Sequence, residues 1–130
     1  HVDNAYQISQ WYPKPAVFDA SGWHPIPYLD QGEFYSEYGS FDVKITLPSN
    51  YVVGSTGELQ TIEELNFLER LSDSTKKIKE FSSVDSFPSS STTYKTLHYK
   101  QSNIHDFAWF ADKRFIVDYY CNATKFFFIF

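Results

Sequence analysis

The chain has 130 residues and a mass of 15.2 kDa, which fits one domain with a modest core and leaves no room for two. Its formal net charge of −5 and pI near 5.2 argue against nucleic-acid or anionic-membrane partners, because both require clustered Lys and Arg. Aromatic residues make up 20% of the chain, and rings pack well on pleated, half-buried surfaces, so the composition favours strands.

Cysteine content and hydropathy narrow the class of protein further. Cys121 stands alone, so no intramolecular disulfide is possible and packing must hold the fold together. No segment approaches the roughly 20 consecutive apolar residues of a membrane-spanning helix. We therefore expect no membrane span.

The first 32 residues are rich in proline and aromatic side chains. Proline removes a backbone donor and fixes φ, which disfavours a regular helix or a central strand. The residues concerned are Pro13, Pro15, Pro25 and Pro27. This stretch is predicted to be an extended loop with short strands.

Residues 41–47 alternate between apolar and polar side chains, which is typical of a strand with one buried face. Pro48, Ser49 and Asn50 indicate a turn, residues 51–53 a second strand, and residues 54–57 a further turn before a short segment at 58–60. The spacing predicts an antiparallel meander.

One helix is predicted, roughly from Ile62 to Ser72. Thr61 and Glu64 have the spacing of a capping box at its start. Its apolar residues recur at helical spacing. They are Ile62, Leu65, Leu68 and Leu71. The Ser/Thr-rich stretch 82–93 lacks periodicity and is predicted to be a mobile loop.

The remaining chain predicts three more strands, at 94–101, 107–111 and 115–120, with a turn at Ser102 and Asn103. Asp106 is expected to cap the turn into Phe107 through its side-chain oxygen. Together these elements predict an all-β fold, a mostly antiparallel β-sandwich or saddle, with one short α-helix.

The histidines do not have the spacing of a zinc site. His1, His24, His98 and His105 include no HExxH pair, and His98 and His105 are seven positions apart, which fits no compact pair of ligands. Both are expected near opposite ends of a hairpin. No GxSxG nucleophile setting is present either. We therefore predict no catalytic residue and no metal ligand.

One other polar group, formed by His24, Asp30 and Glu33, has two interpretations. An imidazole beside two carboxylates is suited to acid–base chemistry. Ordinary turn chemistry in a proline-rich loop explains the same residues without a substrate, and we favour it.

The aromatic residues of the first part also have two interpretations. Exposed rings are good stacking platforms, which favours a β-sandwich module that binds carbohydrate or peptide, above all through Trp11, Tyr12 and Trp23. The alternative, which we favour, is that these rings form the core. The same set includes Tyr28, Phe34 and Tyr35.

Several long strings carry a family resemblance. They are Gln10-Trp11-Tyr12-Pro13-Lys14, Gly22-Trp23-His24, Gly32-Glu33-Phe34-Tyr35, Phe41-Asp42-Val43-Lys44-Ile45-Thr46-Leu47-Pro48 and His105-Asp106-Phe107-Ala108-Trp109. With them, residues 4–117 resemble the amino-terminal β-domain of gluzincin zinc aminopeptidases, the aminopeptidase N family, in its bacterial branch. The expected division is a partial β-domain at 1–118 and an apolar tail outside the family pattern at 119–130.

The resemblance implies a non-catalytic domain, truncated before the HExxH catalytic domain, that is not an enzyme by itself. In that family the β-domain packs on a helical domain that holds zinc, and its edge helps to bind the amino terminus of the peptide. Zinc belongs to the full-length family and not to this chain. The resemblance implies a catalytic domain in trans as partner, and an extracytoplasmic or membrane-associated location in a bacterium.

The family's substrate-contacting amide is matched here by Gln10, with Gln7 as the second choice. A polar side chain that precedes two aromatic residues also fits a structural role, in which it satisfies buried backbone groups. At the other end of the chain, the apolar tail 126–130 predicts a homo-oligomer, because an exposed apolar segment tends to be buried against another copy.

Overall fold

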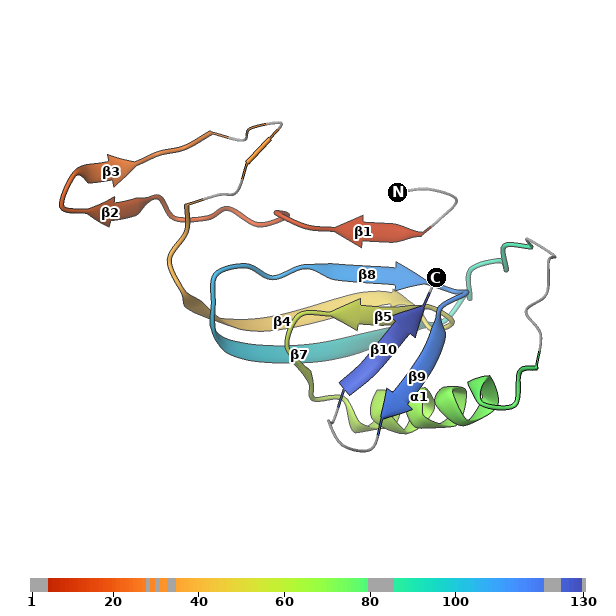
Figure 1. Ribbon diagram of the computed structural model, residues 1–130. Coiled ribbons are helices and arrows are strands. Elements are labelled where there is room, and N and C mark those ends of the chain that lie inside the picture. Colours follow the sequence, from red (N-terminus) through yellow and green to blue (C-terminus); the bar gives the residue numbers. More distant parts are fainter. Residues whose placement is uncertain are drawn as a thin grey trace.

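The computed structural model describes residues 5–27, 29, 31–32, 35–79, 86–120 and 125–129. This part of the chain is mostly β with one helix, which confirms the predicted fold class (Figure 1). None of its helices is long and apolar enough to cross a membrane. The elements are β1 (Tyr6–Ile8), β2 (Val17–Asp19), β3 (Gly22–His24), β4 (Gly39–Pro48), β5 (Val52–Ser55), β6 (Glu58–Leu59), α1 (Ile62–Thr75), β7 (Tyr94–Ile104), β8 (Trp109–Asp112), β9 (Ile116–Tyr120) and β10 (Lys125–Ile129).

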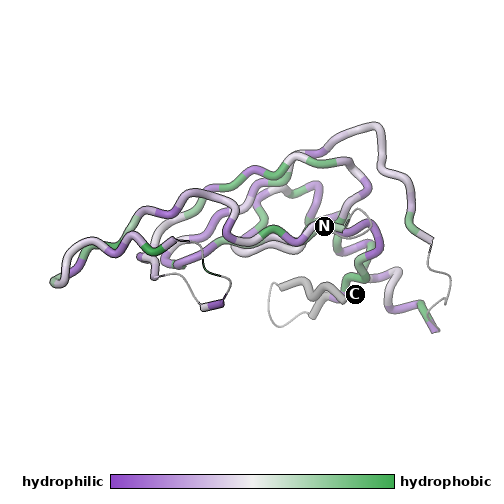
Figure 2. Tube along the Cα trace, turned by 90° about the horizontal axis from the view of Figure 1, so that it is seen from above, coloured by the Kyte–Doolittle hydropathy of each residue, from purple (hydrophilic) through white to green (hydrophobic). Residues whose placement is uncertain are grey.

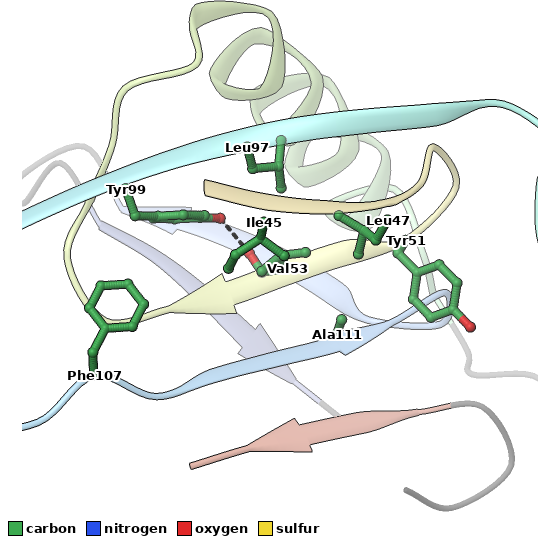
Figure 3. Packing of buried hydrophobic residues seen from close by; sticks show 8 residues of the cluster. All are labelled: Ile45, Leu47, Tyr51, Val53, Leu97, Tyr99, Phe107 and Ala111. Atoms are coloured by element: carbon green, nitrogen blue, oxygen red, sulfur yellow. Dashed lines mark hydrogen bonds between the residues drawn. The ribbon is translucent and has the colours of Figure 1, made fainter. Parts of the chain in front are cut away.

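The main core lies between two three-stranded sheets, with strand orders β4-β7-β6 and β1-β8-β5. Its side chains come from both sheets and from the loops beside them (Figure 3). They are Ile45, Leu47, Tyr51, Val53, Leu97, Tyr99, Phe107 and Ala111. The predicted alternation along β4 is confirmed, because Ile45 and Leu47 are buried while Asp42 and Lys44 are exposed.

The predicted meander is wrong. β5 does not pair with β4 but crosses to the other sheet, where it pairs with β8. The reason is that residues 51–54 are all buried. Val53 packs in the main core, whereas Val52 packs in a second cluster on the other side of β5. A strand buried on both faces cannot stay at a solvent-exposed hairpin position.

The helix α1 closes the second cluster, whose buried members are Val52, Leu68, Phe115 and Val117. It extends to Thr75 rather than to Ser72. The predicted capping box is wrong. Thr61 is the N-cap, but its hydroxyl accepts a hydrogen bond from the His98 N–H (3.0 Å), and Glu64 binds Lys95 (2.6 Å). Both side chains of the expected capping box therefore bind residues of β7 instead of the backbone at the start of the helix.

The predicted turn at Ser102 and Asn103 is also wrong, because β7 continues to Ile104. Asn103 has a φ of 59°, and the pairing of β7 with β4 shifts register between Gly39 and Phe41. An irregularity of this kind lets a strand pass a left-handed residue without ending. The reversal comes later, after His105, and β8 starts at Trp109 rather than at Phe107.

The Ser/Thr-rich stretch is irregular at residues 86–93, as predicted, while its residues 82–85 lie outside the described part. It makes specific contacts nonetheless. Asn50 donates a hydrogen bond to the Ser89 carbonyl (2.9 Å), and Ser91 N–H donates to the Asn50 side chain (2.9 Å). The cations of Lys113 and Arg114 lie over the Phe87 ring.

The carboxyl-terminal tail includes a strand that the sequence analysis did not predict. β10 pairs antiparallel with β9, from Lys125 opposite Tyr120 to Ile129 opposite Ile116. Backbone pairing with β9 therefore orders the stretch expected only as an apolar tail. Self-association through this tail stays a prediction.

Residues 9–38, which we call the arm, leave the sandwich after β1 and return at β4. The described part of the arm is extended with two short strands, as predicted. The β2–β3 hairpin projects from one end of the molecule (Figure 1). Figure 2 shows the same hairpin reaching beyond the strands of the sandwich.

Candidate functional site

The arm is fastened to the sandwich at its beginning by three side chains. Trp11 Nε1 donates a hydrogen bond to the Phe107 carbonyl (2.9 Å), and the Tyr12 hydroxyl donates to Asp106 Oδ1 (3.0 Å). The Lys14 ammonium lies 3.3 Å from the same carboxylate oxygen. Two segments far apart in the sequence, residues 11–14 and 106–107, therefore meet in one polar cluster.

Asp106 is the centre of this cluster. Its Oδ1 accepts a hydrogen bond from the Phe107 N–H (2.7 Å), which confirms the predicted turn cap. Burial alone would raise the pKa of Asp106, but hydrogen bonds from Phe107, Tyr12 and Lys14 outweigh it and lower the pKa. Burial and the bond to Asp106 raise the pKa of Tyr12 to about 12. The carboxylate is thus charged and the phenol neutral at pH 7.

The same turn holds the end of the arm. The Ser36 hydroxyl donates a hydrogen bond to the His105 carbonyl (3.0 Å), and the rings of Tyr38 and His105 meet edge to face with centroids 5.8 Å apart. Both ends of the arm are therefore fixed on residues 105–107.

The β2–β3 hairpin carries an exposed aromatic pair on one face. Phe18 and Trp23 are directly opposite in register, with ring centroids 5.0 Å apart. Their exposed fractions are 62% and 69%. The turn is tight, with Gly22 at a φ of 104° and the Ser21 N–H bonded to the Asp19 carboxylate (2.8 Å). A glycine suits this left-handed position, where a side chain would be strained.

The other face of the hairpin carries the buried Val17 and a polar group. His24 Nε2 lies 2.8 Å from Asp19 Oδ1, and the Tyr35 hydroxyl donates to Asp19 Oδ2 (3.2 Å). The hydrogen bond from His24 is the main cause of a lowered pKa of Asp19, and the bond to Asp19 raises the pKa of Tyr35. These contacts fix the hairpin against the following segment, so that Phe18 and Trp23 face away from it.

Asp30 and Glu33, the two carboxylates predicted beside His24, lie outside the described residues. The carboxylate that the structure does place beside His24 is Asp19. Neither Asp19 nor Phe18 was among the residues predicted from the sequence. The signal was present in the turn sequence Asp19-Ala20-Ser21-Gly22, which is flanked on each side by an aromatic residue, Phe18 and Trp23, and is typical of a short hairpin.

The preferred core interpretation of the arm's rings is wrong for Trp11, Trp23 and Tyr35, which are 46%, 69% and 48% exposed. Tyr12 is half-buried and packs against the core, and Tyr28 and Phe34 lie outside the described residues. Val17 lies among these rings in the sequence and is only 1% exposed, so this part of the arm buries an aliphatic side chain and leaves the larger rings exposed.

The two candidate glutamines are both on the surface. Gln7 lies in β1, opposite Phe110, and its side chain is exposed. Gln10 is exposed as well and has a left-handed φ of 53°, immediately before the anchored Trp11. Neither amide is placed to satisfy a buried backbone group.

His98 and His105 do not lie at opposite ends of a hairpin, contrary to the prediction. His98 lies within β7, and His105 follows its end. His98 Nε2 lies 2.6 Å from Asp42 on the outer face of the β4–β7 pair, where its hydrogen bond is the main cause of a lowered pKa of Asp42. Among the described residues, no group of three or more His, Cys, Asp or Glu side chains has the arrangement of a metal site.

Comparison with known proteins found no matching family model, curated protein or solved structure. The fold and the site define a β-sandwich domain with one helix and an anchored arm that presents aromatic side chains.

Proposed function

We propose that this chain is a non-catalytic β-domain of the kind found at the amino end of gluzincin zinc aminopeptidases. It binds a metal-bearing catalytic domain through its arm. The catalytic domain supplies the zinc ion and the general base, and the β-domain walls the site on one side. Two observations support this role: the sequence strings that resemble the family and the exposed aromatic side chains of the arm.

The observation that supports it best is an arm fixed at both ends whose rings face solvent. Exposed aromatic groups that form a continuous surface typically mark an interaction site, since Trp and Tyr are enriched at the centres of interfaces. Hydrogen bonds from Trp11, Tyr12 and Ser36 hold the backbone of the arm before any partner arrives. Less conformational entropy is then lost on binding.

Within such an assembly, Gln10 is the proposed contact to the α-amino group of the peptide, with Gln7 as the second choice. Its amide oxygen is an acceptor for an ammonium N–H. Gln10 is exposed beside the anchored Trp11, so its backbone is positioned while its side chain is free to reach a ligand. Accurate placement of the amino end lowers the barrier of the reaction that the partner carries out.

A binding measurement tests the proposal. The probe is the isolated catalytic domain of a gluzincin aminopeptidase, titrated into this chain in a calorimeter. We expect Phe18→Ala with Trp23→Ala to weaken binding by about a thousandfold, because two aromatic anchors of about 2 kcal/mol each sum to about 4 kcal/mol. The matched control is Tyr94→Ala, a ring that is 69% exposed but lies on β7. Equal loss in both variants would overturn the role of the arm.

The non-enzyme part has its own test. The purified chain, supplied with zinc, is assayed for release of a chromophore from aminoacyl anilides. We expect no hydrolysis. Activity that a chelator abolishes would contradict the proposal.

A second candidate function rests on the Phe18–Trp23 pair alone, which also suits a module that stacks on a sugar or a peptide ring. The test is tryptophan fluorescence during titration with oligosaccharides and peptides. A saturable change that Trp23→Phe removes would favour this function. A flat response would exclude this second function, and domain docking would be the remaining proposal.

A further inference from the structure

The strand β4 has a partner on only one side. It spans Gly39–Pro48, and within the described part of the chain it pairs with β7 alone, at the edge of the β4-β7-β6 sheet. An edge strand of this length presents a row of backbone donors and acceptors that another strand can pair with.

The positions of the open backbone groups follow from the hydrogen bonds. Ser49 N–H donates to the Thr93 carbonyl (2.9 Å), and this pair continues the β4–β7 register. In antiparallel strands only every second residue bonds to a given neighbour. On the other side of β7, Gln60 N–H donates to the His98 carbonyl (2.7 Å), which agrees with the same phase.

The backbone N–H and carbonyl groups that point away from β7 therefore belong to Asp42, Lys44 and Thr46. Among the described residues, no hydrogen bond reaches the backbone N–H or carbonyl of these three beyond the sheet itself. Pro48 has no N–H, and its carbonyl accepts from Tyr51 N–H (3.1 Å), so it closes this end of the edge.

We propose that this edge pairs with the β4 strand of a second copy of the chain, antiparallel and with Asp42 opposite Lys44 of the other copy. The arrangement is two-fold symmetric, so the Asp42–Lys44 pair forms twice. The two β4-β7-β6 sheets become one continuous sheet of six strands. The inference depends on β4 alone and stands whether or not the arm binds a catalytic domain.

Charge selects this register. Moving one copy by two residues in one direction places Lys44 opposite Lys44, and moving it in the other direction places Asp42 opposite Asp42. Like charges directly opposite destabilise a pair of strands. A lysine in the middle of an edge normally discourages pairing. Here Asp42 of the opposite copy adds Lys44 to the two partners that it has in its own chain, His98 at 2.6 Å and Lys100 at 3.1 Å. Lys44 is exposed and has no ion pair among the described residues.

The apolar face of β4 fits the same register. It places Val43 opposite Val43 at the symmetry axis and Phe41 opposite Ile45. Val43 and Phe41 are only partly buried in the single chain, so pairing covers apolar surface that the sandwich leaves open at its rim. A shift by one residue would turn these side chains to the solvent face.

Charge reversal tests the register by sedimentation equilibrium. Lys44→Glu and Asp42→Lys should each be monomeric, because each places like charges opposite in a self-pair. Mixed in equal amounts they should form a dimer of one copy of each. Asp42 of the Lys44→Glu copy then lies opposite Lys44 of the Asp42→Lys copy, and the introduced glutamate lies opposite the introduced lysine. We expect each variant alone to raise the dissociation constant about tenfold or more. A mixture as monomeric as its components would overturn the register.

A cross-linking experiment tests the symmetry axis in a Cys121→Ser background. Opposed residues at a non-hydrogen-bonded position have Cα atoms about 4.5 Å apart, within reach of a disulfide. Val43→Cys should therefore form a covalent dimer under mild oxidation. Thr46→Cys, which faces Ser40 of the other copy, should not. Equal cross-linking of both would contradict the proposal.

Lys44→Pro tests the edge itself. The N–H of residue 44 points away from β7, so proline there removes no bond of the existing ladder. We expect the variant to be folded, which circular dichroism checks, and to be monomeric. If the unaltered chain stays monomeric at every concentration, while a peptide of the β4 sequence binds it but not Lys44→Pro, the edge takes a foreign strand and self-pairing is overturned.

Discussion

At the scale of single residues, the molecule depends on a few charged side chains that join distant segments. Asp106 connects the start of the arm to the turn after β7 through Tyr12, Lys14 and the Phe107 N–H. Glu64 and Lys95 connect α1 to β7 with an ion pair of 2.6 Å. In both places a carboxylate joins two segments that are distant in the sequence, whereas apolar packing joins such segments elsewhere in the molecule.

Asp106 predicts a pH dependence of stability. Its pKa is lower in the folded state, so the contribution is fully present above the unfolded pKa near 4 and is lost as pH falls through the folded value. Asp106→Asn should lower the free energy of unfolding by about 1–2 kcal/mol at pH 7. Urea unfolding at several pH values measures it. The difference between the two proteins should shrink in acid, and a constant difference would contradict the role of the charge.

The Glu64–Lys95 pair predicts strong coupling. Glu64→Gln leaves the ammonium of Lys95, whose side chain is only 17% exposed, without its carboxylate, and should lower the free energy of unfolding by about 3 kcal/mol. Replacing both, as Glu64→Leu with Lys95→Met, should cost less than the single change. A double-mutant cycle in urea measures the coupling energy. Simple additivity would show that the pair is not a buried unit.

At the scale of elements, the sequence predicts what local patterns determine. The alternation of residues 41–47 indicated β4, and helical spacing indicated α1. The ends of elements were less predictable, because tertiary partners compete for them. His98 N–H occupies the Thr61 hydroxyl, and the bulge at Asn103 lets β7 continue past an expected turn.

The connection from β5 to β6 depends on a glycine. Gly57 has a φ of 90°, and a Cβ there would lie 3.0 Å from the Lys100 carbonyl oxygen. Gly57→Ala should therefore lower the free energy of unfolding by about 1–3 kcal/mol. Gly39→Ala is the matched control, since its Cβ would meet only Phe41 at 4.0 Å. Thermal unfolding that shifts both variants equally would refute the local strain.

At the scale of the whole molecule, the chain is a sandwich that carries an arm. The sequence could not predict which strands pair across long distances, because β5 with β8 and β1 with β8 are tertiary choices set by burial on both faces of β5. It also could not predict that the rings of the arm stay exposed. Composition alone does not distinguish a core ring such as Phe107 from a surface ring such as Trp23.

The arrangement gives the arm its proposed role. One turn, residues 105–107, holds both ends of the arm. The β2–β3 hairpin reaches past the sandwich (Figure 1). Its Phe18 and Trp23 are exposed.

Amide hydrogen exchange tests this central claim most directly. The chain is measured alone and with the isolated catalytic domain of a gluzincin aminopeptidase. We predict that added protection appears at the amides of the arm, strongest at residues 17–24, and not at the amides of β4 and β7. Protection confined to other elements, or none at a saturating concentration of the catalytic domain, would contradict the account.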